Sequence, residues 1–292
     1  MNVTGIIAEY NPFHNGHLYQ LTKAREETDA DYMIVVLSGD FVQRGTPAIA
    51  DKYIRTKTAL LAGADLVLEL PVYFSSSSAD FFAAGAVSLL DKIGCVDHLS
   101  FGSEHGSIKE LSDIAGHLLS ETPSYKTVLK KHLKQGNSYA LASAKASMEQ
   151  FSDSRMAETL LKEPNNTLGI AYLKALSGRN STITPHTVLR TGGGYHATEK
   201  GALSASAVRH TVQTDGSLDS VSAQMPAYAY DLLADTYGTS FPIFENDFSS
   251  LLAYKLRTIL SNARLSAEDN SSPAHALTCY ADVSEELACR IN

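Results

Sequence analysis

The sequence predicts an α/β fold built on a Rossmann-like parallel sheet, and three observations lead to this prediction. Short apolar runs rich in β-branched residues alternate with helical stretches from the start of the chain. Turn residues separate these runs, as at Pro71 and Gly102. The 292 residues are 44% hydrophobic and 19% charged, which supports a full hydrophobic core and excludes a disordered chain or a coiled coil.

The elements follow one another in strand–helix order. Pro71 ends the third strand, and Gly63 ends the helix before it. Parallel strands need right-handed crossovers, so the loops at their carboxyl ends converge on one crevice, where we expect the chemistry. The expected strands are residues 3–8, 32–37, 66–70, 98–101 and 182–189, and the expected helices are residues 17–28, 51–62, 79–90 and one that begins near Ser204.

The second half of the chain is expected to be mainly helical. Residues from 108 to about 176 read as a helical insertion, after which the sheet closes with the last strand. We therefore expect an α/β domain over residues 1–215 and a helical C-terminal region over residues 216–292. This region stops without a cap or a polar tail, so we expect it to be incomplete.

The net charge and the cysteine content of the chain exclude several classes of protein. With 32 acidic and 24 basic residues the formal net charge is −8, which excludes a general nucleic-acid coat but leaves room for a local basic patch. Cys95, Cys279 and Cys289 form no Cys-x-x-Cys pair, so we expect neither a disulfide framework nor a zinc ribbon. No 18-residue apolar run or signal-peptide pattern is present, and we expect a cytoplasmic protein without membrane contact.

The strongest functional signal is His14-Asn15-Gly16-His17, placed where the first strand passes into a helix. The helix amino end offers unpaired N–H groups and Gly16 allows close approach, so phosphates are favoured there. His14 and His17 can donate imidazole N–H groups to a triphosphate; the alternative is helix capping or packing. A zinc site would need a further ligand, and neither a Walker loop nor a Gly-x-Gly-x-x-Gly turn is present.

A second signal lies near the carboxyl end of the same predicted domain. Ser204 and Ser206 precede Arg209 at the start of a helix that follows a glycine-rich stretch. The hydroxyls could bind the β and γ phosphates while Arg209 neutralises the departing pyrophosphate; the alternative is that a serine simply caps the helix. Together the two segments would form one triphosphate cradle, with His14, His17 and Arg209 as its catalytic residues.

On these motifs the chain resembles the nucleotidylyl transferase superfamily, whose members carry His-x-Gly-His and a Ser-Ser-Thr-x-Ile-Arg type sequence, although this chain departs from the latter at Ala205 and Ser206. It more closely resembles the bacterial tRNA(Met) cytidine acetate ligases. That likeness runs over essentially the whole chain and rests on residues 9–17 (Glu-Tyr-Asn-Pro-Phe-His-Asn-Gly-His), 38–45, 100–104 and 164–166, with Arg190 before the glycine loop. The resemblance implies a parallel sheet of nucleotidylyl transferase type.

The resemblance also implies that the domain over residues 1–215 binds ATP, and it implies which residues contact ATP. Without it, Gly102 could be a turn residue, Asn165 a helix cap and Arg190 a surface ion-pair residue. We add Ser204 and Ser206 from the cradle argument. The implied contacts are Ile7, Ala8, Glu9, Tyr10, Asn11, Pro12, Phe13, His14, Asn15, Gly16, His17, Gly102, Asn165 and Arg190.

The implied reaction joins acetate to ATP as acetyl-adenylate and then acetylates N4 of the wobble cytidine of elongator tRNA(Met). We expect Mg²⁺ to be held mainly by phosphates, so no protein metal ligand is predicted. RNA contacts are expected from Arg44 and Lys52, with Gln43 and Arg55 in the same segment, or these form a solvated surface. Lys126, Lys130 and Lys134, with Lys131 beside them, repeat at helical spacing and form a second basic candidate, or a solvated helix face.

Two further functions stay open. A small-molecule nucleotidylyl transferase would use the same cradle to join AMP to a phosphorylated metabolite. A nonenzymatic RNA- or nucleotide-binding module would keep the fold without turnover. No residue spacing distinguishes acetate from a slightly larger acid, because one methylene is discriminated by only about 1–3 kcal/mol.

Overall fold

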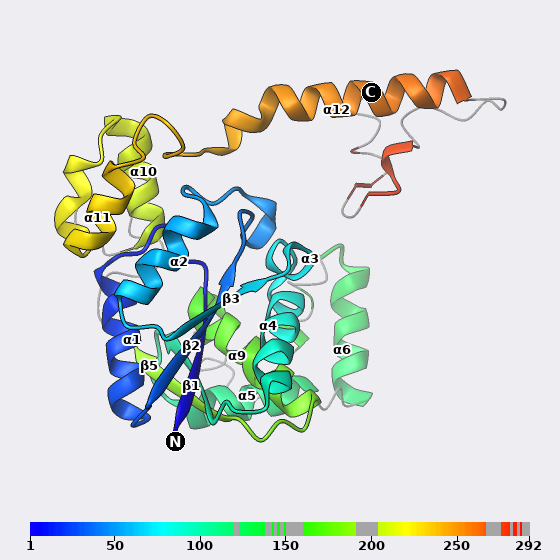
Figure 1. The fold of residues 1–292 in the computed structure, drawn as a ribbon. Coiled ribbons are helices and arrows are strands. Elements are labelled where there is room, and N and C mark those ends of the chain that lie inside the picture. The colour runs from blue at the N-terminus through cyan, green and yellow to red at the C-terminus, as the bar shows by residue number, and fades with distance from the viewer. Residues whose placement is uncertain are drawn as a thin grey trace. The chain divides into compact units, whose positions relative to one another are not determined.

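The computed structural model contains one five-stranded parallel sheet (Figure 1). It describes residues 1–119, 123–137, 142, 145–146, 149, 160–190, 204–266, 276–280, 283–284 and 287. The strand order is β3-β2-β1-β4-β5, so the order reverses between β1 and β4, where ligands bind in open α/β sheets. The strands are β1 (Val3–Ala8), β2 (Tyr32–Ser38), β3 (Leu66–Leu70), β4 (His98–Ser103) and β5 (Thr184–Leu189).

Helices cover both faces of the sheet, as crossovers between parallel strands require (Figure 1). The first and second helices pack on one face, and the fourth, fifth and ninth pack on the other. The helices are α1 (Asn15–Glu27), α2 (Lys52–Leu61), α3 (Val72–Ser75), α4 (Ala79–Ile93), α5 (Ile108–Leu119), α6 (Pro123–Lys134), α9 (Pro164–Gly178), α10 (Ala205–Asp215), α11 (Ala227–Ala234) and α12 (Ser249–Ser266), with 3-10 turns η1 (Gln43–Gly45), η2 (Asp219–Gln224) and η3 (Glu245–Phe248).

The main core lies between the sheet and the layer of α4, α5 and α9. Alternate residues of the strands, such as Val3 and Ile7, enter it, because successive side chains point to opposite faces. Gly169 lets α9 approach the sheet: a Cβ at this position would lie 2.4 Å from Cε2 of Phe101. The predicted helical stretch 108–176 thus contributes α5 and α9 to the core layer.

The sequence predictions of the elements agree with the structure to within a few residues. The first and third strands have the predicted bounds, and β4 continues through Gly102 to Ser103. The first helix starts at Asn15, two residues before the predicted start, because His14 is its N-cap. The glycine-rich loop over residues 192–194 and Cys289 lie outside the described residues.

The chain divides into two compact units, Met1–Ile243 and Phe244–Asn292. The first unit thus includes α10, η2 and α11, which lie on both sides of the domain boundary that the sequence suggests at residue 215. In the second unit, Leu260 of α12 packs on Leu277. No helix within the described ranges is both long and apolar enough to cross a membrane.

Candidate active site

The turn between β1 and α1 is built around the two motif histidines. His14 is the N-cap of α1, and its Nδ1 accepts a hydrogen bond from the backbone N–H of Gly16 at 3.0 Å. Nδ1 of His17 accepts from the backbone N–H of His14 at 3.3 Å. The two histidines thus form a reciprocal capping box. His14 stands at the N-cap, where Ser or Thr is usual, and His17 stands at the third helical position, where Glu is usual.

This capping geometry fixes the tautomer of both rings. An acceptor nitrogen carries no proton, so in the neutral rings the proton is on Nε2, which remains a donor. The rings stack with centroids 3.8 Å apart. Burial, and to a lesser extent the positive charge of Arg190, lowers the pKa of His14 to about 4. Burial also places the pKa of His17 well below its ordinary value, with His14 and Arg190 acting in the same direction. Both rings are therefore neutral N–H donors at pH 7.

The low pKa of His14 makes the stability of the fold depend on pH. An unfolded histidine binds its proton near pH 6.5, whereas folded His14 does so only near pH 4, so acid favours the unfolded chain within this window. We expect the free energy of unfolding to be fully retained above pH 6.5 and to fall towards pH 4, as urea titrations would measure. His14→Asn, which can still cap the helix, should flatten this slope, and an unchanged slope would contradict the assignment.

Aromatic side chains hold the motif loop from behind. Tyr10 and Phe13 are 1% and 2% exposed, and their ring centroids lie 5.0 Å and 5.6 Å from that of His17. The peptide bond between Asn11 and Pro12 is cis, and Oδ1 of Asn11 accepts from the backbone N–H of Ile49 at 2.7 Å. The loop that presents the histidines is thus fixed by packing on one side and by a hydrogen bond to the next loop on the other.

The second motif lies against the first. Nη1 of Arg209 donates to the carbonyl oxygen of Asn11 at 2.5 Å, and its Nη2 donates to Oγ of Ser206 at 3.2 Å. Nδ2 of Asn15 donates to the carbonyl oxygen of Ala223 at 3.0 Å, which adds a second link to the same part of the chain. The histidine loop is therefore joined by side-chain hydrogen bonds to α10 and to η2.

The two serines of this motif have different surroundings. Ser204 is the N-cap of α10, and its Oγ accepts from the backbone N–H of Ala207 at 3.1 Å, which is the capping alternative. Ser204 is 6% exposed. Ser206 is instead joined to Arg209 at the first turn of the helix. Of the two, Ser206 is the one placed to orient the arginine.

Arg190 and Gly102 meet at the ends of β5 and β4. A Cβ on Gly102 would lie 3.3 Å from Cγ of Arg190, so the absence of a side chain lets the arginine lie across β4. The backbone N–H of Arg190 continues the strand pairing by donating to the carbonyl oxygen of Ser103 at 2.9 Å. Its positive charge lowers the pKa of both motif histidines.

Glu104, to which the sequence analysis assigns no role, joins the end of β4 to the start of α9. Oε1 of Glu104 accepts from Nδ2 of Asn165 at 2.5 Å, and its Oε2 accepts from the backbone N–H of Asn166 at 2.9 Å. Oδ1 of Asn166 accepts hydrogen bonds from the backbone N–H groups of Glu104 and His105. Nε of Arg190 lies 4.0 Å from Oε1 of Glu104. Asn165 does not cap α9, because the N-cap of this helix is Glu163.

The segment after β2 corrects one expectation. Arg55 is not an RNA or phosphate contact: it is 1% exposed and donates to the carbonyl oxygens of Glu9, Ser38, Gly39 and Ala50. Burial lowers its pKa to about 10, against the opposing effect of nearby carboxylates. Its position at the fourth residue of α2 gave no sign of this, because burial depends on loops that are distant in sequence.

Glu9 links the end of β1 to the same loop. Its Oε1 accepts from the backbone N–H of Gln43 at 3.0 Å. Burial raises the pKa of Glu9, whereas the Gln43 hydrogen bond and then the charges of Arg209, Arg55 and Arg44 lower it. The positive charges of these arginines therefore offset part of the cost of burying the Glu9 carboxylate.

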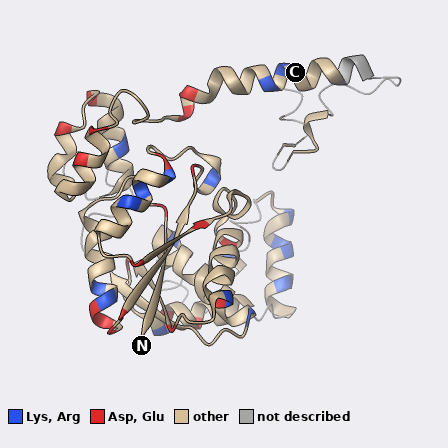
Figure 2. Cartoon of the chain, viewed as in Figure 1, with Lys and Arg blue, Asp and Glu red and all other residues tan. Residues whose placement is uncertain are grey.

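The side chains of the candidate RNA contacts are exposed or partly exposed to solvent. Arg44 is exposed and has a φ of 65°, and Lys52 is partly buried in an ion pair with Glu69 at 2.8 Å. Figure 2 shows basic residues along α6. Four lysines of this helix are exposed, namely Lys126, Lys130, Lys131 and Lys134, whereas Tyr125 and His132 are buried. Within the described ranges, no group of three or more His, Cys, Asp and Glu side chains could hold a metal ion.

Comparison with known proteins agrees with this geometry. A family model described as HIGH Nucleotidyl Transferase matches residues 1–292. The tRNA(Met) cytidine acetate ligase of Clostridium novyi (strain NT) is 42% identical over 261 residues, 89% of this chain and 65% of the relative. That of Thermoanaerobacter sp. (strain X514) is 45% identical over 260 residues, 88% and 64% of the two chains. The chain thus spans just under two thirds of the length of these relatives.

Solved structures extend the likeness to three dimensions. Apo Thermotoga maritima TmcAL has a TM-score of 0.83 and 33% identity, covering 100% of this chain and 74% of that one. The same protein bound with alpha-thio ATP has a TM-score of 0.82 and 32% identity, covering 100% and 73%. The resemblance to the tRNA(Met) cytidine acetate ligases is confirmed, and the chain belongs to the HIGH nucleotidyl transferase family.

Proposed function

We propose that the protein is an ATP-dependent tRNA(Met) cytidine acetate ligase. The observation that carries this proposal is the hydrogen bond from Arg209 to the carbonyl oxygen of Asn11, which places the arginine beside the loop of His14 and His17. Two neutral N–H donors, a guanidinium and a helix amino end then border one site. The names of the similar proteins, and the ATP analogue bound to one of them, support this function.

In the proposed first step, a carboxylate oxygen of acetate attacks the α phosphorus of ATP. The new O–P bond forms as the bond to pyrophosphate breaks, and acetyl-adenylate results. His14 and His17 donate from Nε2 to the phosphates, and Arg209 offsets the charge that develops on pyrophosphate. When bound, Mg²⁺ adds positive charge to the phosphates, which would hold it together with water because no acidic cluster is present among the described residues.

In the proposed second step, N4 of the wobble cytidine of elongator tRNA(Met) attacks the acetyl carbonyl carbon. The N–C bond forms, the C–O bond to AMP breaks, and one N4 proton is released. A cytidine in the anticodon loop is already unpaired, so presenting it costs less than flipping a base from a duplex. Such a reaction takes place in the compartment that holds tRNA and ATP, and we propose the cytoplasm.

The ATP contacts remain those that the resemblance implies. Gly102 and Arg190 adjoin each other, Asn165 is held by Glu104, and residues 7–17 run through the motif loop. Ser206 would act with Arg209, and Ser204 would act mainly by capping α10. We also retain residues 1–215 as the proposed ATP-binding part of the chain. Arg44, Lys52, Lys126, Lys130 and Lys134 are the proposed RNA contacts.

Isotope exchange between pyrophosphate and ATP tests the proposal. We expect exchange that depends on added acetate, because reversal of the first step needs acetyl-adenylate. Exchange that depends on a phosphorylated metabolite instead would identify a small-molecule nucleotidylyl transferase. The absence of any exchange, in a sample that binds ATP, would leave a nonenzymatic binding module.

A further inference from the structure

A pocket outside the cradle lies at the carboxyl ends of β2 and β3, beneath the first turns of α2. Its volume is about 200 Å³. Drug-sized ligands occupy pockets of roughly 300–1,000 Å³, so this one suits a single small ring. It adjoins the loop after β2, on the side of β1 away from Gly102 and Arg190. The lining residues are Leu37, Ser38, Lys52, Tyr53, Thr56, Val67 and Glu69.

One wall of the pocket carries two opposite charges side by side. Nζ of Lys52 lies 2.9 Å and 2.8 Å from the two carboxylate oxygens of Glu69. The carboxylate raises the pKa of Lys52, so the ammonium is charged. A Cβ on Gly39 would lie 2.5 Å from Oε1 of Glu69, so a side chain at residue 39 would displace this carboxylate. The wall therefore presents an acceptor next to a donor.

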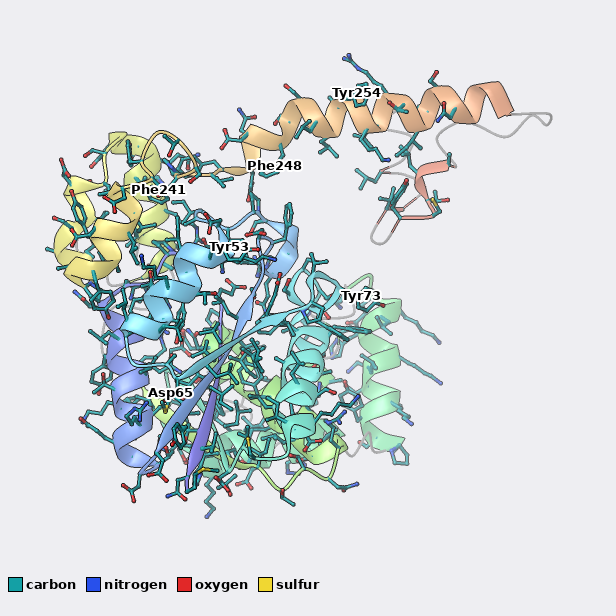
Figure 3. All side chains as sticks on the ribbon, in the orientation of Figure 1. Tyr53, Asp65, Tyr73, Phe241, Phe248 and Tyr254 are labelled. Carbon is teal, nitrogen blue, oxygen red and sulfur yellow. The ribbon has the colours of Figure 1, made fainter. Side chains whose placement is uncertain are left out.

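An aromatic ring stands at the same pocket. Tyr53 is 76% exposed and is labelled on α2 in Figure 3. Nζ of Lys52 lies 5.6 Å from the centre of its ring. Unpaired bases in RNA loops are commonly held by stacking on such rings. Asp40 and Asp51 lie on the same segment and would repel a phosphate, which favours a base over a phosphate as the occupant.

We propose that this pocket receives the acceptor cytosine and distinguishes it from uracil. The inference rests on the proposed function. The pairing edge of cytosine carries an amino donor at N4 beside the acceptors N3 and O2, which matches Glu69 as acceptor and Lys52 as donor. Uracil places an acceptor at position 4 and a donor at N3, so both contacts are reversed. Tyr53 would stack on the base.

The test uses the full chain and a synthetic anticodon stem-loop RNA with either cytidine or uridine at the wobble position. Glu69→Gln keeps the shape of the side chain but can turn a donor towards the base. We expect acetyl transfer to cytidine, relative to acetate-dependent exchange by the same variant, to fall at least ~10-fold. The preference for the cytidine RNA over the uridine RNA in competition binding should fall with it.

Tyr53 gives a second variant that leaves the core untouched. Tyr53→Ala should lower transfer relative to exchange, and Tyr53→Phe should restore it, because phenylalanine keeps the stacking face. Glu26→Gln is the matched control, since Glu26 pairs with Lys23 at 2.7 Å on the surface of α1. It should change neither ratio.

Three results would overturn the inference. Unchanged transfer ratios and base preference in Glu69→Gln and Tyr53→Ala would remove the pocket from base recognition. A rise in KM for ATP in the exchange assay, with transfer falling only in proportion, would assign the pocket to adenine. Equal losses in Tyr53→Phe and Tyr53→Ala would exclude stacking. Failure of the proposed function is a separate result, because it removes acetate-dependent exchange from the unsubstituted chain.

Discussion

Replacing His17 with alanine is expected to lower acetate-dependent pyrophosphate exchange by about 10²–10³-fold, the loss typical of removing one oriented donor to a developing negative charge. The ring is neutral, and its Nδ1 accepts from the backbone of His14, so Nε2–H is its only donor. The loss should appear in kcat more than in KM for ATP, because the charge on the phosphates grows as pyrophosphate leaves.

Two amide substitutions of His17 separate donation from helix capping. His17→Asn can replace the Nδ1 acceptor but has no donor at the position of Nε2, so its exchange should be as low as that of alanine. His17→Gln can extend an amide N–H towards that position and should recover part of the rate. Alanine at exposed His210, next to Arg209, is the control and should leave exchange unchanged. Equal activity in His17→Ala and the unsubstituted chain would remove His17 from the mechanism.

Replacing Arg55 with leucine is expected to lower the free energy of unfolding by about 3–5 kcal/mol, as when one partner of a buried charged network is removed. Four carbonyl oxygens at the ends of β1 and β2 and before α2 would lose their donor. Buried acceptors without partners are costly, and Glu9 would lose a neighbouring positive charge. Urea unfolding at pH 7 measures the change.

Lys23→Met, on the surface of α1, is the control for loss of a positive charge that is not buried. Lys23 pairs with Glu26 in solvent, so its loss should cost no more than about 1 kcal/mol. Arg55→Lys should give an intermediate value, because an ammonium cannot reach all four carbonyl oxygens with the geometry of the guanidinium. If Arg55→Leu is as stable as Lys23→Met, the hydrogen bonds to the carbonyl oxygens do not hold these loops in place.

Local patterns were enough to predict the sheet and its order of elements. The strands are short apolar runs, and turn residues such as Pro71 mark their ends, so their bounds depend little on the rest of the chain. The sequence also predicted that His14 lies at the turn between the first strand and the first helix, where the structure has it. The predicted joining of His17 and Arg209 in one site agrees with the hydrogen bond to Asn11.

What the sequence could not predict depends on contacts between distant loops. Arg55 looks like any charged residue on an amphipathic helix until the ends of two strands enclose it. Glu104 appears only as part of a recognised motif, and its contacts with Asn165 and Asn166 depend on where α9 returns to the sheet. The cap formed by His14 was only one of two interpretations, and in the structure capping and donation use different nitrogens of the same ring.

The hydrogen bond between Arg209 and Asn11 spans 198 positions in the chain, which sets a constraint on biosynthesis. The histidine loop is synthesised early, whereas Arg209 is added only after all five strands of the sheet have been translated. At about 5–20 residues per second, this interval lasts roughly 10–40 s. During that time the nascent polypeptide has the histidines of the triphosphate cradle but not its arginine. The ability to form acetyl-adenylate should therefore arise late in translation, when Arg209 binds the histidine loop.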